Sequence, residues 1–390
     1  MHALSIEQLR RALAIRDLTD PADGPHAMQF LIDDIVAALA ARWAIPVVVH
    51  RASPIVSIAD NYDRLGYPPD GVARDVRYTR YVCDTALLRT QTSALIPPLL
   101  REPLPDDVLL ACPGLVYRRD AIDRLHTGEP HQIDLWRIAH APLGTRDLDE
   151  MIAAVVAAAL PGARWRTLAA SHPYTTNGLQ IDVAAGDDWV EIGECGLAAP
   201  ALLAGRAPPA SSVPTSATLL AGRAAPTSSV PASAVPSGLA MGLGLDRLLM
   251  LRKGIDDIRL LRASDPRIAS QMRDLAPYRA VSSMPPVRRD LSIVVDAVPS
   301  AEELGDAVRG ALGARAELLE SLAIVSATPY AELPAAAIAR LGIAPGQHNA
   351  LVRLTLRAID RTLTHTECNA LRDDVYAAIH VGTVHAWASR

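Results

Sequence analysis

Short β-rich stretches separated by turns occupy residues 46 to about 200. They include VVVH (47–50), LQIDVA (179–184) and DWVEIGE (188–194). Only a few helical segments interrupt them, so the pattern predicts an antiparallel sheet with helices packed on it. Residues 1–45 differ, because the apolar positions of AMQFLIDDIVAALAARW (27–43) have the spacing of an amphipathic helix.

A different order of elements begins at residue 285. It reads as strand, helix, strand, strand, helix and a short final strand. The first five elements are DLSIVVD (290–296), AEELGDAVRGAL (301–312), LLESLAIVSA (318–327), ALVRLTLRAI (350–359) and THTECNALRDDVYAAI (364–379). This order is the split βαββαβ arrangement of a ferredoxin-like domain. The fold class predicted for the whole chain is therefore α+β, and such a domain alone does not define a function.

Two segments between these regions lack a regular apolar period. LLAGRAPPASSVPTSAT (202–218) is followed at once by the near-copy LLAGRAAPTSSVPASAV. Pro, Ser and Ala dominate, so residues 202–236 are expected to form a flexible surface insertion. Residues 266–284 are interpreted as a linker. The predicted organisation is a helical segment over 1–45, a domain over 46–265, the linker, and a domain over 285–390.

The composition narrows the class of partner. The formal net charge is -5, so no global basic field draws the chain to nucleic acid, although this does not exclude a local basic patch. The four cysteines are far apart and show no metal-ligand spacing, which favours buried thiols in a reducing compartment. The chain has no long apolar run and its first residues lack the apolar core of a secretion signal. We therefore expect a cytoplasmic protein that does not enter a membrane.

Charged residues are concentrated in VYRRDAIDRLHTGEPHQIDLWRI (116–138). A buried charge costs several kcal/mol unless it is paired or meets a ligand. The stretch is therefore either a surface hairpin with ordinary ion pairs or the wall of a site for a charged substrate. The motif GLGLDR (242–247) does not follow a strand in a βαβ unit and matches no dinucleotide fingerprint. Taken alone, either motif most often has only a structural role: an exposed ion pair in the first case and close packing of a helix on a sheet in the second.

Several such motifs in a fixed order resemble class II phenylalanyl-tRNA synthetases, especially the single-chain organellar type. The matching pieces are NYDRLGYPPDGVARD (61–75), LLRTQTS (87–93), VYRRDAIDRLHTGEPHQID (116–134), HPYTTNGLQIDV (172–183), WVEIGECGLAAP (189–200), SGLAMGLGLDRLLMLRKGIDDIR (237–259), PPVRRDLSIVVD (285–296) and IDRTLTHTECNALRD (359–373). The resemblance implies a class II catalytic domain followed by a ferredoxin-like anticodon-binding domain. It implies a chain, monomeric or homodimeric, that needs no separate β-chain.

The resemblance also implies a reaction in which ATP activates an amino acid to its adenylate, followed by transfer to tRNA. It assigns the catalytic, ATP-binding arginines to Arg118 and Arg247, and places His126 near the phosphates. Glu191 matches an acid near the nucleotide that can hold Mg²⁺, a cation that prefers carboxylate and phosphate oxygens. Arginine suits phosphoryl chemistry, because its planar fork binds two oxygens at once and stays charged.

The amino acid ammonium group would be bound by acceptors that the resemblance places at Gln91, Ser93, Gln132 and Asp134. Gln91 stands where the family has histidine, and Asp134 where it has glutamate. The side-chain pocket is assigned to His172, Tyr174, Ala240 and Met241, of which all but Ala240 replace phenylalanines. Because His172 and Tyr174 add hydrogen-bonding groups, a modified or more polar amino acid competes with phenylalanine as substrate.

The tail carries arginines that match a tRNA-binding role, namely Arg288, Arg289 and Arg361. The alternative is that these arginines pair with the many acids of the same domain. Two other functions also fit the sequence. One is a synthetase-like paralogue that activates a non-standard amino acid, with or without tRNA. The other is a non-catalytic protein that binds ATP and an amino acid.

Overall fold

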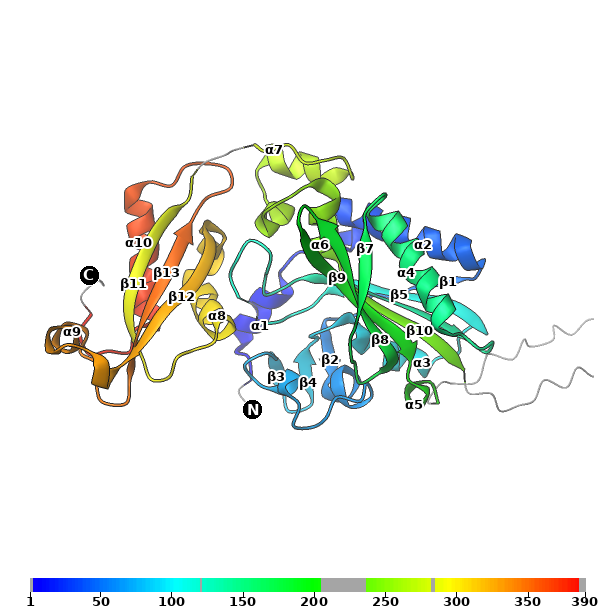
Figure 1. Ribbon diagram of the computed structural model, residues 1–390, viewed down its shortest axis with the longest axis horizontal. Coiled ribbons are helices and arrows are strands. Elements are labelled where there is room, and N and C mark those ends of the chain that lie inside the picture. The colour runs from blue at the N-terminus through cyan, green and yellow to red at the C-terminus, as the bar shows by residue number, and fades with distance from the viewer. Residues whose placement is uncertain (1–2, 120, 205–235, 282–284, 386–390) are drawn as a thin grey trace, which may run out of the picture.

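The computed structural model describes residues 3–119, 121–204, 236–281 and 285–385. Figure 1 shows two bodies, a larger one built before residue 282 and a smaller one built after residue 284. Most of the tandem repeat, residues 205–235, lies outside the described residues. None of the described helices combines the length and the apolar character needed to cross a membrane.

A seven-stranded sheet organises the larger body, as predicted for an antiparallel sheet with flanking helices. Only the outer pair β1–β5 is parallel, and every other neighbouring pair is antiparallel. The strands in spatial order are β1 (Val47–Val49), β5 (Asp107–Leu115), β6 (His131–Ala139), β10 (Ser237–Gly244), β9 (Asp188–Ala198), β8 (Thr175–Ala185) and β7 (Trp165–Ala169).

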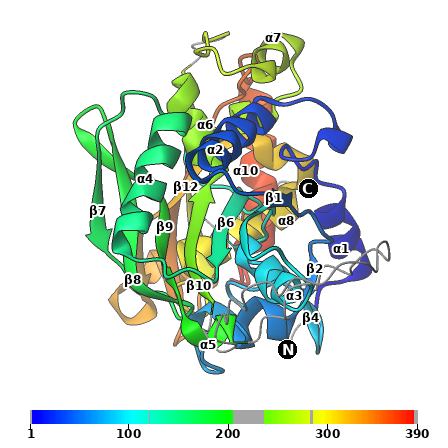
Figure 2. The same ribbon diagram turned by 90° about the vertical axis from the view of Figure 1, so that its right-hand side faces the viewer.

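Three helices cover one face of this sheet: α2 (Ala27–Trp43), α4 (Thr145–Ala159) and α6 (Leu245–Lys253). They pack against one another, as Figure 2 shows. Helix α2 begins and ends where the apolar spacing predicted, and it buries Leu31, Ile35 and Leu39 completely. Together the helices and the sheet enclose the main hydrophobic core. This closed face leaves the opposite face of the sheet for a binding site.

Shorter elements surround the other face of the sheet. They are α3 (Ile96–Leu100), α5 (Pro200–Leu203) and a small sheet of β2 (Ile55–Ser57), β4 (Ala86–Leu88) and β3 (Tyr81–Cys83). Helix α1 (Ile6–Leu13) begins with a capping box in which Ser5 and Gln8 exchange hydrogen bonds. These elements form small separate cores, so they leave a hollow above the centre of the large sheet.

Residues 266–281 are packed and do not form a free linker. Helix α7 (Pro266–Ala269) buries Ile268, and Met272 follows it into the main core. Lys253, which is 1% exposed, donates from Nζ to the carbonyls of Asp274 (2.8 Å) and Ala276 (2.5 Å). A buried ammonium that meets carbonyl acceptors holds this stretch against the larger body. The predicted linker is therefore packed on the larger body over residues 266–281.

The smaller body contains a three-stranded antiparallel sheet with two helices on one face. The strands are β11 (Val287–Val295), β13 (His348–Leu356) and β12 (Leu319–Pro329), in that order, and the helices are α8 (Ala301–Leu312) and α10 (His365–Ile379). An additional helix, α9 (Ala335–Leu341), lies between β12 and β13 and was not predicted. The strand order agrees with three of the four strands of a ferredoxin-like sheet.

The predicted final strand is not formed in residues 380–385. Val381 donates one backbone hydrogen bond to the Val294 carbonyl (3.0 Å), as a fourth strand beside β11 would. The Val294 N–H, however, donates to the side chain of His380 (3.1 Å). The Thr383 N–H donates to Gly342 at the end of α9 (3.1 Å). Backbone N–H groups that would pair with a neighbouring strand are thus bound by a side chain and by a loop carbonyl instead.

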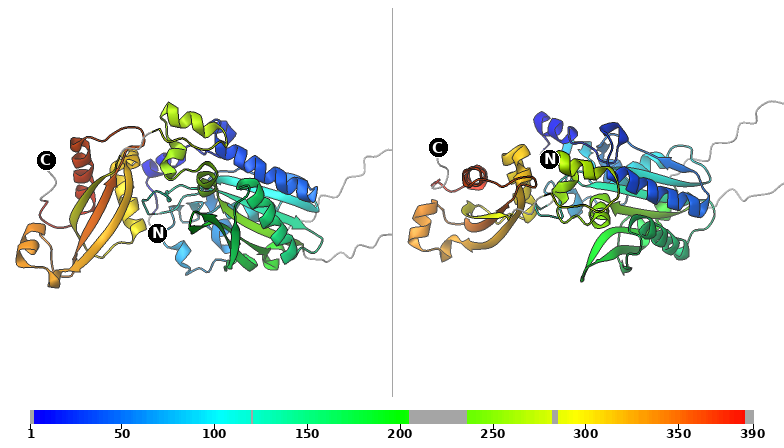
Figure 3. Two further views of the ribbon diagram at one scale, coloured as in Figure 1. Left: turned by 45° about the horizontal axis from the view of Figure 1, so that its top comes forward. Right: turned by 90° about the horizontal axis from the view of Figure 1, so that it is seen from above.

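Ion pairs join the two bodies, which Figure 3 shows side by side. Asp306 of α8 lies 3.6 Å from Arg80 and 3.4 Å from Arg119 of the larger body. A second group links Asp257, which is 1% exposed, to Arg357 of the smaller body (3.3 Å). These contacts place the smaller body beside the charged hairpin of residues 116–130.

Candidate active site

A cavity of about 420 Å³ opens on the face of the large sheet that the long helices leave uncovered. Its walls come from β6, β9, β10, the start of α6 and the loops before β8 and α3. Every predicted nucleotide-binding or amino-acid-binding residue lines it except Ala240 and Met241. These lining residues are Gln91, Ser93, Arg118, His126, Gln132, Asp134, His172, Tyr174, Glu191 and Arg247.

The floor of the cavity is formed by alternate residues of β6 and β10. Gln132 and Asp134 lie opposite Gly244 and Gly242 in the antiparallel pair. A Cβ added at either glycine would have no neighbour closer than 3.9 Å. Protein packing therefore does not require these glycines, and their missing side chains keep the floor open for a ligand.

Met241 does not line the cavity, which contradicts its predicted place in the side-chain pocket. Successive residues of a strand point to opposite faces. Met241 accordingly packs in the main core with Leu239 and Leu243, and it is 1% exposed. Ala240 lies on the cavity side but is also buried, in the core cluster that contains Trp136.

The cationic end of the cavity contains three of the residues assigned to ATP. Arg118 donates from Nε to the Thr90 carbonyl (3.0 Å), which fixes its guanidinium at the rim. Arg247 donates from Nη1 to the Glu191 carbonyl (2.9 Å), and its Nη2 lies 3.5 Å from Nε2 of His126. This end therefore presents two permanent positive charges beside a histidine.

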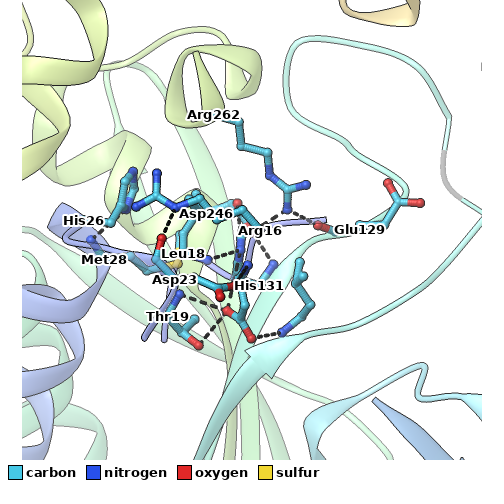
Figure 4. Close-up of polar contacts among 12 residues, drawn as sticks. Arg16, Leu18, Thr19, Asp23, His26, Met28, Glu129, His131, Asp246 and Arg262 are labelled. Atoms are coloured by element: carbon cyan, nitrogen blue, oxygen red, sulfur yellow. Dashed lines mark hydrogen bonds and ion pairs between the residues drawn. The ribbon is translucent and has the colours of Figure 1, made fainter. Parts of the chain in front are cut away.

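A buried pair, His131 and Asp246, supports these residues and was not predicted (Figure 4). Leu18 N–H donates to His131 Nε2 (3.1 Å), so the other ring nitrogen, Nδ1, donates to Asp246 (2.9 Å). Burial opposes ionisation of Asp246, but the contacts with His131 outweigh it and lower the pKa of this carboxyl. The pair connects the first residue of β6 to the first turn of α6, directly before Gln132 and Arg247.

The opposite end of the cavity is rich in acceptors. Asp134 is 2% exposed and accepts hydrogen bonds from Thr92 (2.7 Å), Ser93 (2.9 Å) and the Trp136 indole (2.9 Å). Burial raises the pKa of Asp134 above its usual value despite these donors. A cation placed here would stabilise the ionised carboxylate.

Tyr67, which the sequence analysis did not identify, belongs to the same end. Its hydroxyl donates to Gln91 Oε1 (2.9 Å), and Gln91 Nε2 donates to the Asn61 carbonyl (3.1 Å). Burial raises the pKa of Tyr67 to about 12, so its hydroxyl remains a donor at neutral pH. These contacts fix the orientation of the Gln91 amide.

Two acids of β9, Glu191 and Glu194, line the cavity although they are three residues apart in one strand. Strict alternation would place them on opposite faces. The pairing of β8 with β9 passes over Ile192, which forms a β-bulge and brings both acids to the same face. Burial, followed by the charge of Glu194, raises the pKa of Glu191. Glu194 was not predicted as a site residue.

His172 and Glu194 form a direct pair on the cavity wall. His172 Nε2 lies 2.5 Å from the Glu194 carboxylate, and the Thr175 hydroxyl lies 3.4 Å from Nδ1. The neighbouring Tyr174 ring stacks on Trp136, with ring centroids 5.8 Å apart. Burial raises the pKa of the Tyr174 hydroxyl well above its ordinary value. The predicted side-chain residues His172 and Tyr174 therefore do come together.

The three arginines assigned to tRNA do not form one continuous patch. Arg289 contacts Asn369 (3.2 Å) and His365 (3.1 Å) at α10. Arg361 forms an ion pair with Glu367 (2.7 Å). Arg288 is the neighbour of Arg289 in β11 and therefore points to the opposite face of the sheet.

Comparisons with known proteins show the family to which the chain belongs. Residues 47–272 match the family model described as the class II core domain of tRNA synthetases (F), and the chain belongs to this family. The phenylalanine–tRNA ligase alpha subunit of Prochlorococcus marinus (strain MIT 9313) is 33% identical over 211 residues, which cover 54% of this chain and 56% of that protein. The chain thus spans about half the length of such curated relatives.

Two further comparisons cover more of the chain. The chloroplastic/mitochondrial phenylalanine–tRNA ligase of Arabidopsis thaliana is 25% identical over 353 residues, covering 84% of this chain and 71% of that protein. A solved pyrrolysyl tRNA synthetase from Desulfitobacterium hafniense aligns with a TM-score of 0.43 and 17% identity, over 67% of this chain and 80% of that one.

Proposed function

We propose that this protein uses ATP to activate an aromatic amino acid, phenylalanine or a polar or modified analogue, and then transfers it to tRNA. The observation that carries the proposal is that one cavity is lined both by two arginines, Arg118 and Arg247, and by the acceptors Gln132 and Asp134. The names of the relatives, which are phenylalanine–tRNA ligases, support the same reaction.

In the proposed first step, the amino acid carboxylate attacks the α-phosphorus of ATP in line, and pyrophosphate leaves. Negative charge builds up on the phosphoryl oxygens, so fixed positive charge and positioning supply the catalysis. Arg118 and Arg247 provide this charge without needing a proton transfer. The substrate ammonium group pairs with Asp134, which orients the carboxylate toward the arginines.

Mg²⁺ fits this site through a single protein carboxylate. The described residues contain no cluster of three potential metal ligands. Mg²⁺ commonly uses only one or two carboxylates together with substrate phosphates. Glu191, whose pKa is raised by burial and by Glu194, would hold the ion with ATP. The ion would neutralise phosphate charge.

ATP–pyrophosphate exchange with Arg118→Ala tests the activation step. Loss of one donor that stabilises the transition state costs about 10²–10³ in rate, and the fold should remain intact because Arg118 lies at the rim. Arg119→Ala is the matched control, since Arg119 pairs with Asp306 and does not line this cavity. Exchange by Arg118→Ala at the parent rate would show that the hairpin has another role.

The acceptor of the activated amino acid requires a separate test. Arg288, Arg289 and Arg361 are proposed contacts for tRNA, and aminoacylation of tRNA measured with the intact chain tests this role. The second candidate is a paralogue that activates a non-standard amino acid, with or without tRNA, and the His172–Glu194 pair favours it. A non-catalytic protein would bind ATP without exchange. We further propose a monomer or homodimer that acts without a separate β-chain.

A further inference from the structure

The pair of His172 and Glu194 lies where an apolar wall would suit a phenyl ring. His172 Nε2 donates to one oxygen of Glu194, and its Nδ1 accepts from Thr175. Both ring nitrogens are therefore used inside the protein, which fixes the orientation of the imidazole. The side chain of His172 is only 11% exposed, so the pair belongs to the wall and is not a surface contact.

Glu194 retains acceptor capacity that faces the cavity. A carboxylate has about four lone-pair sites, and within the described part of the chain His172 is the only side chain that donates to it. The Glu194 side chain is 42% exposed and lines the cavity. A ligand in the cavity would cover it, and the carboxylate would then need a donor from that ligand.

Rings of the protein already occupy the apolar space beside this pair. Trp136 is completely buried, and Tyr174 packs on it and on the cluster that includes Ala240. Neither Trp136 nor Ala240 lines the cavity. A substrate side chain in this cavity therefore meets a wall that includes Tyr67, Tyr174 and the partly exposed carboxylate of Glu194.

We propose that the amino acid activated here carries a hydrogen-bond donor on its side chain, such as a hydroxyl or an amine, and that Glu194 binds this donor. His172 is a positioning residue, because it binds the Glu194 carboxylate while both of its ring nitrogens have partners inside the protein. The proposal rests on the proposed function and makes it more specific. Plain phenylalanine would cover Glu194 without supplying a donor, so the site discriminates against it.

ATP–pyrophosphate exchange with a matched set of amino acids tests the proposal. The set is L-phenylalanine, its meta-hydroxy, para-hydroxy and para-amino derivatives, and L-histidine. We expect kcat/KM for at least one donor-bearing amino acid to exceed that for phenylalanine by about 10-fold or more. Glu194→Gln keeps the shape of the side chain and removes its charge. It should reduce this preference by about 10-fold or more.

Four results would contradict the proposal. A preference for phenylalanine over the whole set, or an unchanged preference in Glu194→Gln, overturns the role of Glu194 and leaves the proposed function standing. A change confined to the KM for ATP would place Glu194 at the nucleotide instead. Absence of exchange with every amino acid refutes the activation reaction itself. His172→Asn provides a second variant, in which a weaker preference with unchanged KM for ATP supports positioning by His172.

Discussion

The stability of this protein should depend on pH through one buried histidine, His26, which begins helix α2. The ring is 2% exposed. Its Nδ1 accepts a hydrogen bond from Met28 N–H (3.2 Å), and its Nε2 donates to the Leu261 carbonyl (3.0 Å), as Figure 4 shows in part. Only the neutral ring can accept at Nδ1. Protonation would also place positive charge at a helix N-terminus, where the helix dipole opposes it.

Burial is the largest cause that lowers the pKa of His26, from 6.5 to about 4. The unfolded chain therefore binds a proton near pH 6.5, while the folded chain does so only near pH 4. Because the unfolded state binds more protons in this window, the free energy of unfolding falls as pH falls. At about 1.4 kcal/mol per pH unit, the loss is about 2 kcal/mol between pH 6.5 and 5, and about 3 kcal/mol by pH 4.

The variant His26→Asn isolates this contribution, because asparagine is a good N-cap residue and does not titrate. Urea unfolding of both proteins between pH 7.5 and 5 gives the difference in free energy of unfolding at each pH. We expect the wild type to be more stable at pH 7.5 and its advantage to shrink by about 2 kcal/mol by pH 5. Other acids titrate in both proteins and cancel in the difference. A difference that does not change with pH would refute the reasoning.

Two further predictions concern buried carboxylates. Asp257→Asn removes the buried negative charge that pairs with Arg259 and Arg357 between the two bodies. The free energy of unfolding should therefore fall by about 3–5 kcal/mol, whereas Asp290→Asn, at an exposed ion pair, should cost under about 1 kcal/mol. Equal losses in urea unfolding would contradict this. Asp134→Asn should raise the KM for the amino acid about 10-fold or more in pyrophosphate exchange. The affinity of the wild type for the amino acid should also fall as pH drops through the raised pKa of Asp134. An unchanged KM in the variant would show that Asp134 does not bind the ammonium group.

Local apolar spacing was sufficient to predict elements whose stability is local. Helix α2 occupies residues 27–43 as expected, because its apolar face repeats within the segment itself. The packing of residues 266–281 could not be predicted, because it depends on contacts with other segments of the chain. The ammonium of Lys253 and the buried Ile268 decide their packing, and no local periodicity reveals such contacts.

The candidate site could be predicted mainly from the family resemblance, because the matched motifs contain most of the residues that the fold brings to one cavity. Met241 was an avoidable error, because Ala240 and Met241 are neighbours in a strand and cannot both face one side. Tyr67, His131 and Asp246 lie inside the matched motifs, but the sequence did not assign them a role of their own. Their roles depend on contacts between segments that only the fold brings together.

The two acids of β9 show how a single extra residue determines the chemistry of the cavity. Ile192 and Cys195 are three residues apart and both pack in the main core, whereas Glu191 and Glu194, also three apart, both line the cavity. A strand that alternates strictly cannot place both acids on the cavity face and both apolar residues on the core face. Without a bulge, one acid would be buried against the core at a cost of several kcal/mol. Glycine at 193 makes the bulge possible, since a Cβ there would lie 2.2 Å from the Gly242 carbonyl oxygen. The stretch EIGEC therefore contains, in its own order of acids and apolar residues, the reason why Glu194 faces the cavity.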